Sequence, residues 1–486
     1  MMRLFRTKPV DQLIAESDDS EHGMQKVLTA TNLVLLGIGC VIGTGIFVLT
    51  GTAAAMHAGP AITLSFLLSG VGCIFAGLCY AEFASLLPIA GSAYTYSYAT
   101  LGEFMAWIIG WDLILEYLFA SSTVAVGWSG YMVSFLRDFG IHIPDKLCYS
   151  PIDYTKAAGW FLTGNIINLP SILIIGVVSA LLIVGIKEST RFNNIIVIVK
   201  VVVVLLFIGF GMSYINVDNW TPYIPENTGT FGQFGISGIF TGAGVIFFAY
   251  IGFDAISTAA QETKNPKRDM PIGILGSLLG CMLLYVAVSA VLTGIVDYRE
   301  LNVPAPIAVA IDKTGDTLFW LRPLIKVGAI AGLSSVILVL LLAQPRIFYT
   351  MAKDGLLPKS FSRLHPKFRT PHVTTILTGA IAAVMSGLLP INVLGELVSI
   401  GTLLAFTIVC ASVLVLRIKK PELHRPFKTP WVPFVPIMGM GICMAQMFAL
   451  PWDTWLRLIG WMAIGLAIYF IYGYRHSRLT TLKKKW

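Results

Sequence analysis

The stretch Ile42-Gly43-Thr44-Gly45-Ile46 lies near the midpoint of the first long apolar segment of the chain. Two glycines around a threonine make a poor continuous helix, because each glycine costs about 1 kcal/mol relative to alanine in a helix interior. Close helix packing through Gly39 and Gly43 is the alternative explanation of the same residues. In the sixth apolar segment, Gly242-Ala243-Gly244 precedes a second candidate break at residues 247–253. Together the two stretches predict two helices that are broken at mid-membrane.

Breaks in segments one and six, five segments apart, favour two inverted repeats of five helices with a binding site between them. Irregular backbone is tolerated at membrane depth only beside a cavity, where its polar groups can bind a ligand. Free N–H groups near Thr44 and Gly45 suit a carboxylate, and carbonyl groups at both breaks suit an ammonium. This pattern predicts a site for a zwitterionic α-amino acid. The predicted substrate-binding residues are Ile42, Gly43, Thr44, Gly45, Phe248, Ala249 and Ile251.

The composition predicts an all-α integral membrane protein. Of the 486 residues, 56% are hydrophobic and 12% are charged, whereas about a quarter of the residues of soluble proteins are charged. No Asp, Glu, Lys or Arg occurs between Lys26 and Glu82, and a crossing helix needs about 20 apolar residues. Twelve such segments predict twelve crossings. They lie near Leu33–Met56, Ala61–Leu87, Phe104–Leu136, Ser171–Ile186, Phe192–Ile215, Phe234–Ala260, Ile272–Val296, Pro323–Met351, Val373–Leu389, Val393–Leu416, Val432–Leu450 and Trp455–Tyr474.

The distribution of basic residues predicts the orientation. With both termini in the cytoplasm, the internal segments hold 25 of the 34 Lys and Arg residues, as the positive-inside rule requires. The acidic residues of the first thirty positions exclude a signal peptide. We therefore expect a multi-pass protein of the inner or plasma membrane. Its net charge of +8 indicates contact with anionic lipid and not with nucleic acid.

Several motifs resemble a known family. Gly43–Phe47, Tyr80–Glu82, Glu262–Arg268, and Arg346 with Asp354–Pro358 are similar to motifs of the amino acid–polyamine–organocation superfamily. The more specific stretches resemble its cationic amino acid transporter branch. They are Gly91–Tyr98, Gly110–Tyr117, Val126–Gly130 and Ser399–Leu403. The similarity runs from about Leu28 to the tail, with the motifs in their expected order.

This resemblance implies the LeuT-type arrangement of five plus five helices, followed by two C-terminal helices. The expected units are a cytoplasmic arm (1–30), repeat one (31–216), repeat two (217–417), helices eleven and twelve (418–474) and a basic tail (475–486). Vertebrate members have fourteen helices, so twelve fits bacterial relatives that often carry neutral amino acids. A small membrane subunit is a possible further partner.

Lys200 stands out among the ionisable residues. It lies nine residues beyond Arg191, about 14 Å along a helix, which places it at mid-bilayer. An unpaired buried ammonium is costly, and it can escape that cost by losing its proton. Glu116 is also deep, four residues from Asp112 on one helix face. Glu116 could carry protons, bind a cationic side chain, or serve only structure.

The resemblance also assigns roles to single residues. It implies that Lys200 is the proton-coupling residue, held against backbone carbonyls of the first broken helix. It implies that Phe248 covers the substrate as an outer gate, and that Ser334 and Ser335 face the region of Lys200. Asp254, just inside the second break, could orient that break. Glu82 is expected in a cytoplasmic gate network.

The sequence thus predicts a proton-coupled amino acid symporter that imports neutral or cationic L-amino acids, or both, by alternating access. An exchanger of the same fold is the nearest alternative, and a channel or a non-transporting sensor is more distant. No catalytic or metal-binding motif is visible, so neither an enzyme nor a cofactor is expected.

Overall fold

The computed structural model describes residues 6–8, 28–87, 92–155, 159–184, 190–258, 260, 263–303, 305–318, 320–368 and 370–478. Glu262 and most of the predicted N-terminal arm and basic tail lie outside these residues. The described part is almost entirely helical, with one antiparallel hairpin of β1 (Ile152–Thr155) and β2 (Gly159–Leu162).

Long helices make up the body of the protein. They are α4 (Ile62–Leu86), α6 (Glu103–Asp138), α8 (Thr190–Gly211), α11 (Pro266–Ile295), α13 (Leu321–Lys353), α15 (Ile391–Lys419) and α17 (Trp452–Ile468). Shorter apolar helices are α2 (Ala30–Val41), α7 (Leu169–Val184), α9 (Gly235–Ile246), α14 (His372–Leu388) and α16 (Phe434–Ala449). Still shorter are α3 (Thr50–Ala53), α5 (Ser92–Thr100), α10 (Phe253–Thr258), α12 (Pro306–Lys313) and α18 (Tyr474–His476).

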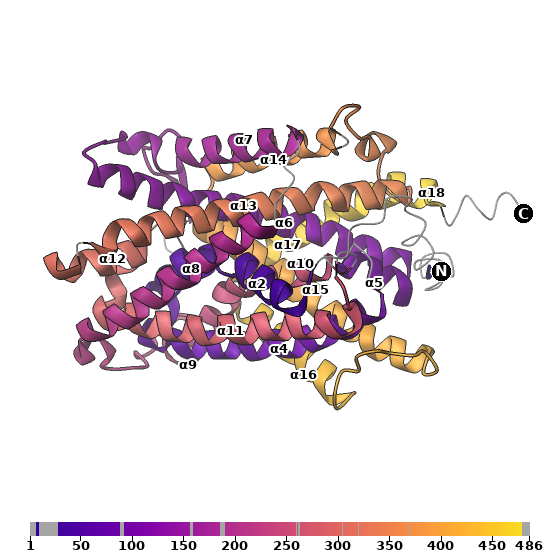
Figure 1. The fold of residues 1–486 in the computed structure, drawn as a ribbon, viewed down its shortest axis with the longest axis horizontal. Coiled ribbons are helices and arrows are strands. Elements are labelled where there is room, and N and C mark those ends of the chain that lie inside the picture. Colours follow the sequence, from indigo (N-terminus) through magenta and orange to yellow (C-terminus); the bar gives the residue numbers. More distant parts are fainter. Residues whose placement is uncertain are drawn as a thin grey trace, which may run out of the picture.

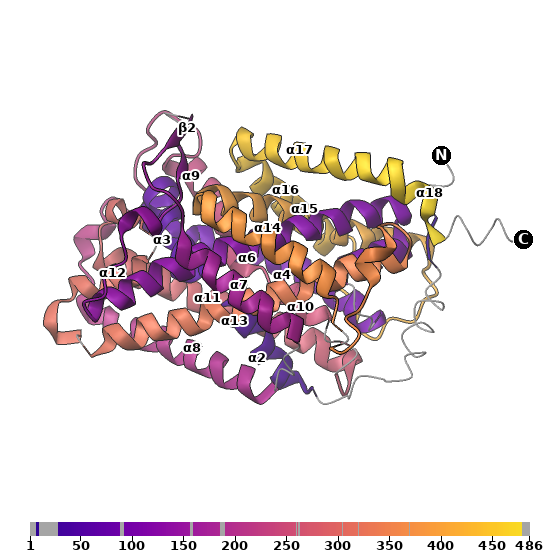
Figure 2. The same cartoon turned by 90° about the horizontal axis from the view of Figure 1, so that it is seen from above.

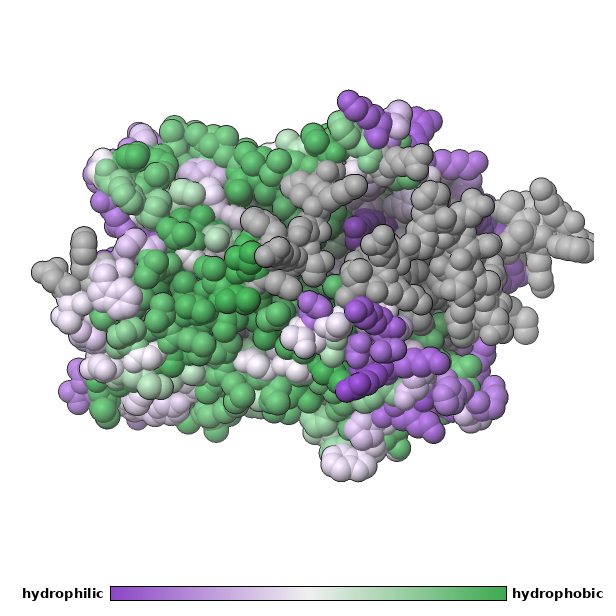
Figure 3. All heavy atoms as spheres, in the orientation of Figure 1, coloured by the Kyte–Doolittle hydropathy of each residue, from purple (hydrophilic) through white to green (hydrophobic). Residues whose placement is uncertain are grey.

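The helices run along the long axis of the molecule, with α12 at one end and α18 at the other (Figures 1 and 2). Apolar residues cover the middle of the visible face, and polar residues gather at the ends (Figure 3). Within the described residues, seven helical segments are long and apolar enough to cross a membrane. Apolar side chains such as Leu173, Leu283 and Val384 are more than half exposed, which suits contact with lipid and not with water. The prediction of a multi-pass membrane protein is confirmed, whereas the twelve crossings, the inverted repeats and the orientation remain predictions.

Both predicted helix breaks are present. Helix α2 ends at Val41, Ile42 is extended, and the chain resumes as the π-helix η1 (Gly45–Leu49) before α3. In the second break, α9 leads into the 3₁₀ turn η7 (Phe247–Tyr250), Ile251 is extended, and α10 follows. Gly252 has a φ of +113°, a conformation open to glycine and strained for other residues.

The two breaks lie directly against each other. A β-carbon on Gly252 would lie 2.9 Å from Cβ of Cys40, and one on Gly45 would lie 2.2 Å from Cα of Ala249. The backbones of the two broken helices therefore touch, and glycine is the residue that allows this approach.

The first and last described residues are held at the same end of the bundle. The backbone N–H of Glu103 donates to the carbonyl of Arg6 at 2.9 Å, and Lys8 forms an ion pair of 3.4 Å with Asp354. The carboxylate of Glu103 also accepts from Tyr469, in the π-helical segment η12 (Tyr469–Gly473) that follows α17, at 3.2 Å. The carbonyl of Asp354 accepts from the N–H of Arg478 at 3.0 Å. An even number of crossings agrees with this arrangement.

We expect Gly45→Val to destabilise the protein far more than Gly43→Ala. The new side chain at Gly45 would meet the backbone of Ala249, which cannot move aside, whereas a β-carbon at Gly43 would lie 3.2 Å from a methyl group of Val336. Overpacking of this kind costs about 1–3 kcal/mol or more. Thermal unfolding of the purified proteins measures the difference, and equal melting temperatures would contradict the close backbone contact.

Candidate functional site

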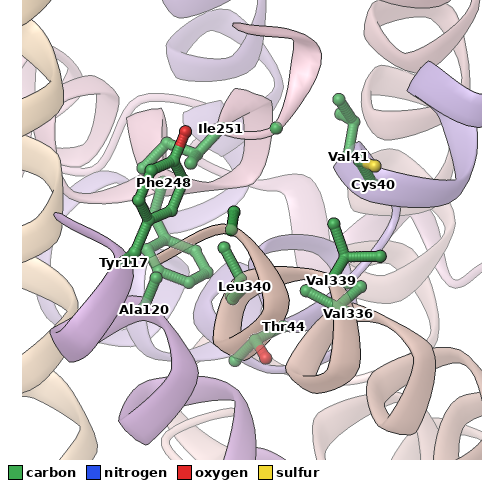
Figure 4. Close-up of a pocket in the computed structure, with 13 residues that line it drawn as sticks. Cys40, Val41, Thr44, Tyr117, Ala120, Phe248, Ile251, Val336, Val339 and Leu340 are labelled. Atoms are coloured by element: carbon green, nitrogen blue, oxygen red, sulfur yellow. The ribbon is translucent and has the colours of Figure 1, made fainter. Parts of the chain in front are cut away.

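A small cavity lies where the two broken helices meet α6 and α13 (Figure 4). Water-sized particles can occupy about 20 Å³ of it, about what one water molecule needs. Larger ligands therefore require the surrounding helices to move. The lining residues are Cys40, Val41, Gly43, Thr44, Tyr117, Ala120, Phe248, Ile251, Gly252, Val336, Val339, Leu340 and Ala343.

The wall formed by α13 is aliphatic. Val336, Val339, Leu340 and Ala343 recur at spacings of three and four residues, which places them on one helix face. Figure 4 shows Val336 and Val339 across the cavity from Phe248 and Tyr117. The described lining residues include no carboxylate, ammonium or guanidinium side chain. An apolar group is therefore the moiety that this wall can accept without leaving a charge unpaired.

Thr44 contributes a hydroxyl group to the lining of the cavity. Thr44 is fully buried, and its Oγ1 has no hydrogen-bond partner among the described residues. A buried hydroxyl without a partner costs about 1–3 kcal/mol. A polar ligand in the cavity could supply the missing hydrogen bond.

Lys200 of α8 is tied to the first break. Its Nζ donates to the carbonyl of Gly39 at 2.8 Å and to that of Ile42 at 3.2 Å, and the residue is fully buried. A β-carbon on Gly332 of α13 would lie 3.1 Å from Cε of Lys200, so the lysine stem packs on that glycine. In the described part of the chain, no carboxylate lies within ion-pair distance of the ammonium. Backbone carbonyls left free by the break are its recorded partners.

Tyr285 of α11 joins the two breaks. Its hydroxyl lies 2.7 Å from the carbonyl oxygen of Val41 and 2.9 Å from that of Ala249. A hydroxyl has one proton to donate, so it bonds one carbonyl at a time. The sequence analysis missed this residue, because a tyrosine within an apolar helix gives no signal of what it contacts.

The second break is held by side chains from three helices. Asp254 accepts from the N–H of Gly252 at 3.2 Å and from the hydroxyl of Tyr117 at 2.8 Å. Ser399 of α15 accepts from the N–H of Phe248 at 3.2 Å and donates to the carbonyl of Val245 at 3.0 Å. Asp254 thus contacts the break that it was expected to orient, and Ser399, which the sequence analysis named only as part of a motif, is a further residue that holds the break.

All seven predicted substrate residues lie in the described part of the chain. Four of them line the cavity: Gly43, Thr44, Phe248 and Ile251. The other three contact the protein itself. The carbonyl of Ile42 accepts from Lys200, Gly45 packs on Ala249, and the carbonyl of Ala249 lies beside the Tyr285 hydroxyl.

The two serines of α13 are placed by their hydrogen bonds. Ser334 accepts from Trp128 of α6 at 2.8 Å. Ser335 donates at 2.9 Å to the carbonyl of Gly332, the glycine on which the stem of Lys200 packs. Ser335 therefore contacts Gly332, which in turn packs against Lys200.

Glu116 and Asp112 are buried on α6 but do not line the cavity. A β-carbon on Gly401 would lie 3.0 Å from Oδ1 of Asp112, so this face of α6 packs on α15. Within the described residues, no hydrogen bond reaches the carboxyl oxygens of Asp112, and Glu116 lies near Thr402 of α15. Glu116 is therefore not among the residues that line the cavity.

The sequence matches the family model described as amino acid permease over residues 28–469. The chain is 47% identical to the methylthioribose transporter of Bacillus subtilis, with 99% of this chain and 100% of that protein aligned. It is 46% identical to the branched-chain amino acid permease BcaP of the same organism, with 98% of this chain and 99% of that protein aligned. It is also 40% identical to the vacuolar cationic amino acid transporter 4 of Arabidopsis thaliana, with 87% of this chain and 68% of that protein aligned.

We expect Tyr285→Phe to leave the fold intact but to weaken substrate binding, because it removes a hydroxyl shared by both breaks. The loss of one such bond should cost about 0.5–1.5 kcal/mol of stability. Tyr250→Phe is the matched control, since Tyr250 belongs to the second break but its hydroxyl donates at 2.8 Å to the carbonyl of Phe66 of α4 and not to a carbonyl of either break. Ligand-dependent thermal shifts compare the two variants. An equal loss of binding in both would contradict a special role for Tyr285.

Proposed function

We propose that this chain, which belongs to the amino acid permease family of the amino acid–polyamine–organocation superfamily, is a proton-coupled symporter for L-amino acids with neutral, apolar side chains. The chain is a transporter and not an enzyme. The observation that carries the proposal is the ammonium of Lys200 on the carbonyls of Gly39 and Ile42, beside an apolar cavity.

The breaks support binding of the amino and carboxyl groups. The first break exposes the backbone around Gly43 and Thr44, where the following helical segment begins with free N–H groups for a carboxylate. The Thr44 hydroxyl can add a further hydrogen bond. The extended residue Ile251 at the second break lines the same cavity and offers backbone groups to the ammonium.

The aliphatic wall supports the choice of side chain. Val336, Val339 and Leu340 would surround the substrate side chain, and burying a cation among them would carry a large desolvation penalty. The name of the branched-chain amino acid permease of Bacillus subtilis agrees with this choice. Cationic substrates, which other relatives' names mention, would need a carboxylate that the described lining does not provide.

Methylthioribose is a second candidate substrate, because a relative 47% identical to this chain is named as its transporter. Its methylthio group suits the aliphatic wall, but the molecule carries neither an ammonium nor a carboxylate. Counterflow in proteoliposomes loaded with leucine, valine, lysine or methylthioribose distinguishes the candidates. We expect leucine and valine to exchange best. A response to methylthioribose alone would overturn the amino acid proposal.

Lys200 supports coupling to protons because its charge strengthens the bonds that hold the first break. Hydrogen bonds from an ionised donor are about twice as strong as those between neutral groups. Protonation would therefore tighten α8 against the end of α2, and loss of the proton would loosen that contact and allow α2 to move. If the proton leaves toward the inner side, α2 then opens toward that side, and the substrate follows the proton to the same side.

We expect Lys200→Met to fold but to lose accumulation driven by a pH gradient, since the variant keeps the apolar stem and deletes the ammonium. Lys326→Met is the matched control. Lys326 is also buried, but it pairs at 2.7 Å with Asp138 near the far end of α6. Uptake into empty proteoliposomes under an imposed pH gradient measures the effect. Gradient-driven uptake by Lys200→Met would place the coupling proton elsewhere, and gradient-independent exchange by the wild type would favour an exchanger.

We expect Glu116→Gln to affect all amino acid substrates alike, because Glu116 lies outside the cavity lining. Thermal-shift titrations with alanine, leucine, lysine and arginine provide the comparison. A selective loss of lysine and arginine binding would show instead that Glu116 contacts a cationic side chain.

A further inference from the structure

The segment between α15 and α16, residues 420–433, projects from the side of the bundle at the end where α18 lies (Figure 1). In Figure 3, the apolar surface of the middle gives way to polar surface at this end of the molecule. Together with the end of α15 and the start of α16, residues 417–434 form what we call the foot. The foot therefore lies at the level where lipid chains give way to headgroups.

A buried carboxylate fixes the inner side of the foot. Glu82 of α4 is 1% exposed and accepts from Arg417 at 3.0 and 2.8 Å. Nε of Arg425, which is also buried, lies 3.1 Å from the same carboxylate. The N–H of Thr429 donates to Glu82 at 2.8 Å, and the hydroxyl of Thr429 donates to the carbonyl of Leu78 at 3.1 Å. All but the last of these contacts involve Glu82, the residue that the sequence analysis expected in a cytoplasmic gate network.

The remaining donors of Arg425 fix the course of the loop. Its guanidinium donates to the carbonyls of Leu416, Lys420, Pro421 and Leu423 at 2.7–3.3 Å. The N–H of Phe427 donates to the hydroxyl of Ser85 at 3.3 Å. Two of the five cations of the foot thus serve its structure, and the loop is held in one conformation against α4.

The outer side of the foot presents an unusual aromatic residue. Trp431 is 79% exposed and has a φ of +45°. That left-handed conformation is uncommon for a bulky residue and persists only where the surroundings enforce it. Phe434, three residues later, is 53% exposed, and Ile418, near the end of α15, is 80% exposed. An exposed tryptophan next to an apolar belt is typical of a side chain at the membrane interface.

Three lysines complete the outer side. Lys419 and Lys428 are exposed and Lys420 is half-buried. None of the three has a recorded ion-pair partner in the described part of the chain. Glu422 is the one acidic residue between positions 417 and 434. The foot therefore has an excess of positive charge that the protein itself does not neutralise.

We propose that the foot binds the headgroup of an anionic phospholipid, with Lys419, Lys420 and Lys428 facing the phosphate and Trp431 inserted at the interface. The charge complements an anionic headgroup, and the aromatic side chain suits the boundary between headgroups and acyl chains. The buried contacts of Glu82, Arg425 and Thr429 hold these groups in place before the lipid arrives, so little ordering cost opposes binding. The site does not depend on which substrate the central cavity transports.

Native mass spectrometry of the full chain tests the proposal, with lipids retained after release from mixed phosphatidylglycerol and phosphatidylcholine micelles. We expect the wild type to retain phosphatidylglycerol preferentially, and the triple variant Lys419→Gln, Lys420→Gln and Lys428→Gln to retain it several-fold less. The matched control removes Lys353, Lys359 and Lys367, three lysines at the same end of the bundle in the segment from the end of α13 to the loop before α14. That control should retain the lipid within about twofold of the wild type.

A second pair of variants separates the aromatic contribution from charge. Trp431→Ala should lower retention of phosphatidylglycerol, whereas Trp452→Ala, which removes a 68% exposed tryptophan at the start of α17, should not. Unchanged melting temperatures establish that each variant is folded. If the triple variant does not fold, the single variant Lys428→Gln is measured in its place. Three results would each overturn the proposal. The wild type would retain both lipids equally, or the foot variants would retain phosphatidylglycerol as well as the wild type does. In the third, the control variants would lose as much of the lipid as the foot variants. Displacement of the lipid by free glycerol phosphate would show that the phosphate alone is bound.

Discussion

A peptide group in the middle of a bilayer must find its hydrogen-bond partner within the protein, and the interior of this structure is arranged around that constraint. The first break frees the carbonyls of Gly39, Val41 and Ile42. Lys200 donates to two of them, and Tyr285 lies at the third. The partners come from α8 and α11, helices distant in sequence. The break is therefore stable only in the assembled bundle, where other helices complete it.

The second break meets the same constraint with different chemistry. Here the freed groups include N–H donors, and the partners are acceptors: the carboxylate of Asp254 for Gly252 and the hydroxyl of Ser399 for Phe248. Tyr285 reaches the carbonyl of Ala249 as well as that of Val41, so one side chain contacts both breaks. Because the backbones also touch at Gly45 and Ala249, a movement of one break is transmitted to the other by direct contact.

The sequence predicted the breaks because glycine acts locally: it weakens a helix wherever it stands. It predicted that Lys200 is buried because the position of a residue along a helix follows from counting residues, whereas its depth in the bilayer stays a prediction. It could not predict Tyr285 or Ser399, whose importance depends on which helix faces which. The same limit applies to Gly45, whose predicted part in ligand binding stays a prediction, and whose contact with Ala249 depends on helix packing that the sequence does not show. Glu116 shows that depth is not enough, since a small rotation of α6 decides whether a side chain faces the cavity or α15.

The strength of the Lys200 contacts sets a limit on what a single proton can do. A hydrogen bond to a charged group contributes about 1.5–3 kcal/mol and a neutral one about 0.5–1.5 kcal/mol. Two bonds that change from charged to neutral therefore alter the balance between conformations by about 2–3 kcal/mol. A full switch from 1:99 to 99:1 needs about 5.5 kcal/mol. On the proposed mechanism the remainder has to come from the substrate, through contacts at Thr44, Phe248 and the aliphatic wall. Neither the proton nor the amino acid then drives the change alone, and this mutual dependence is the physical condition for coupling their transport.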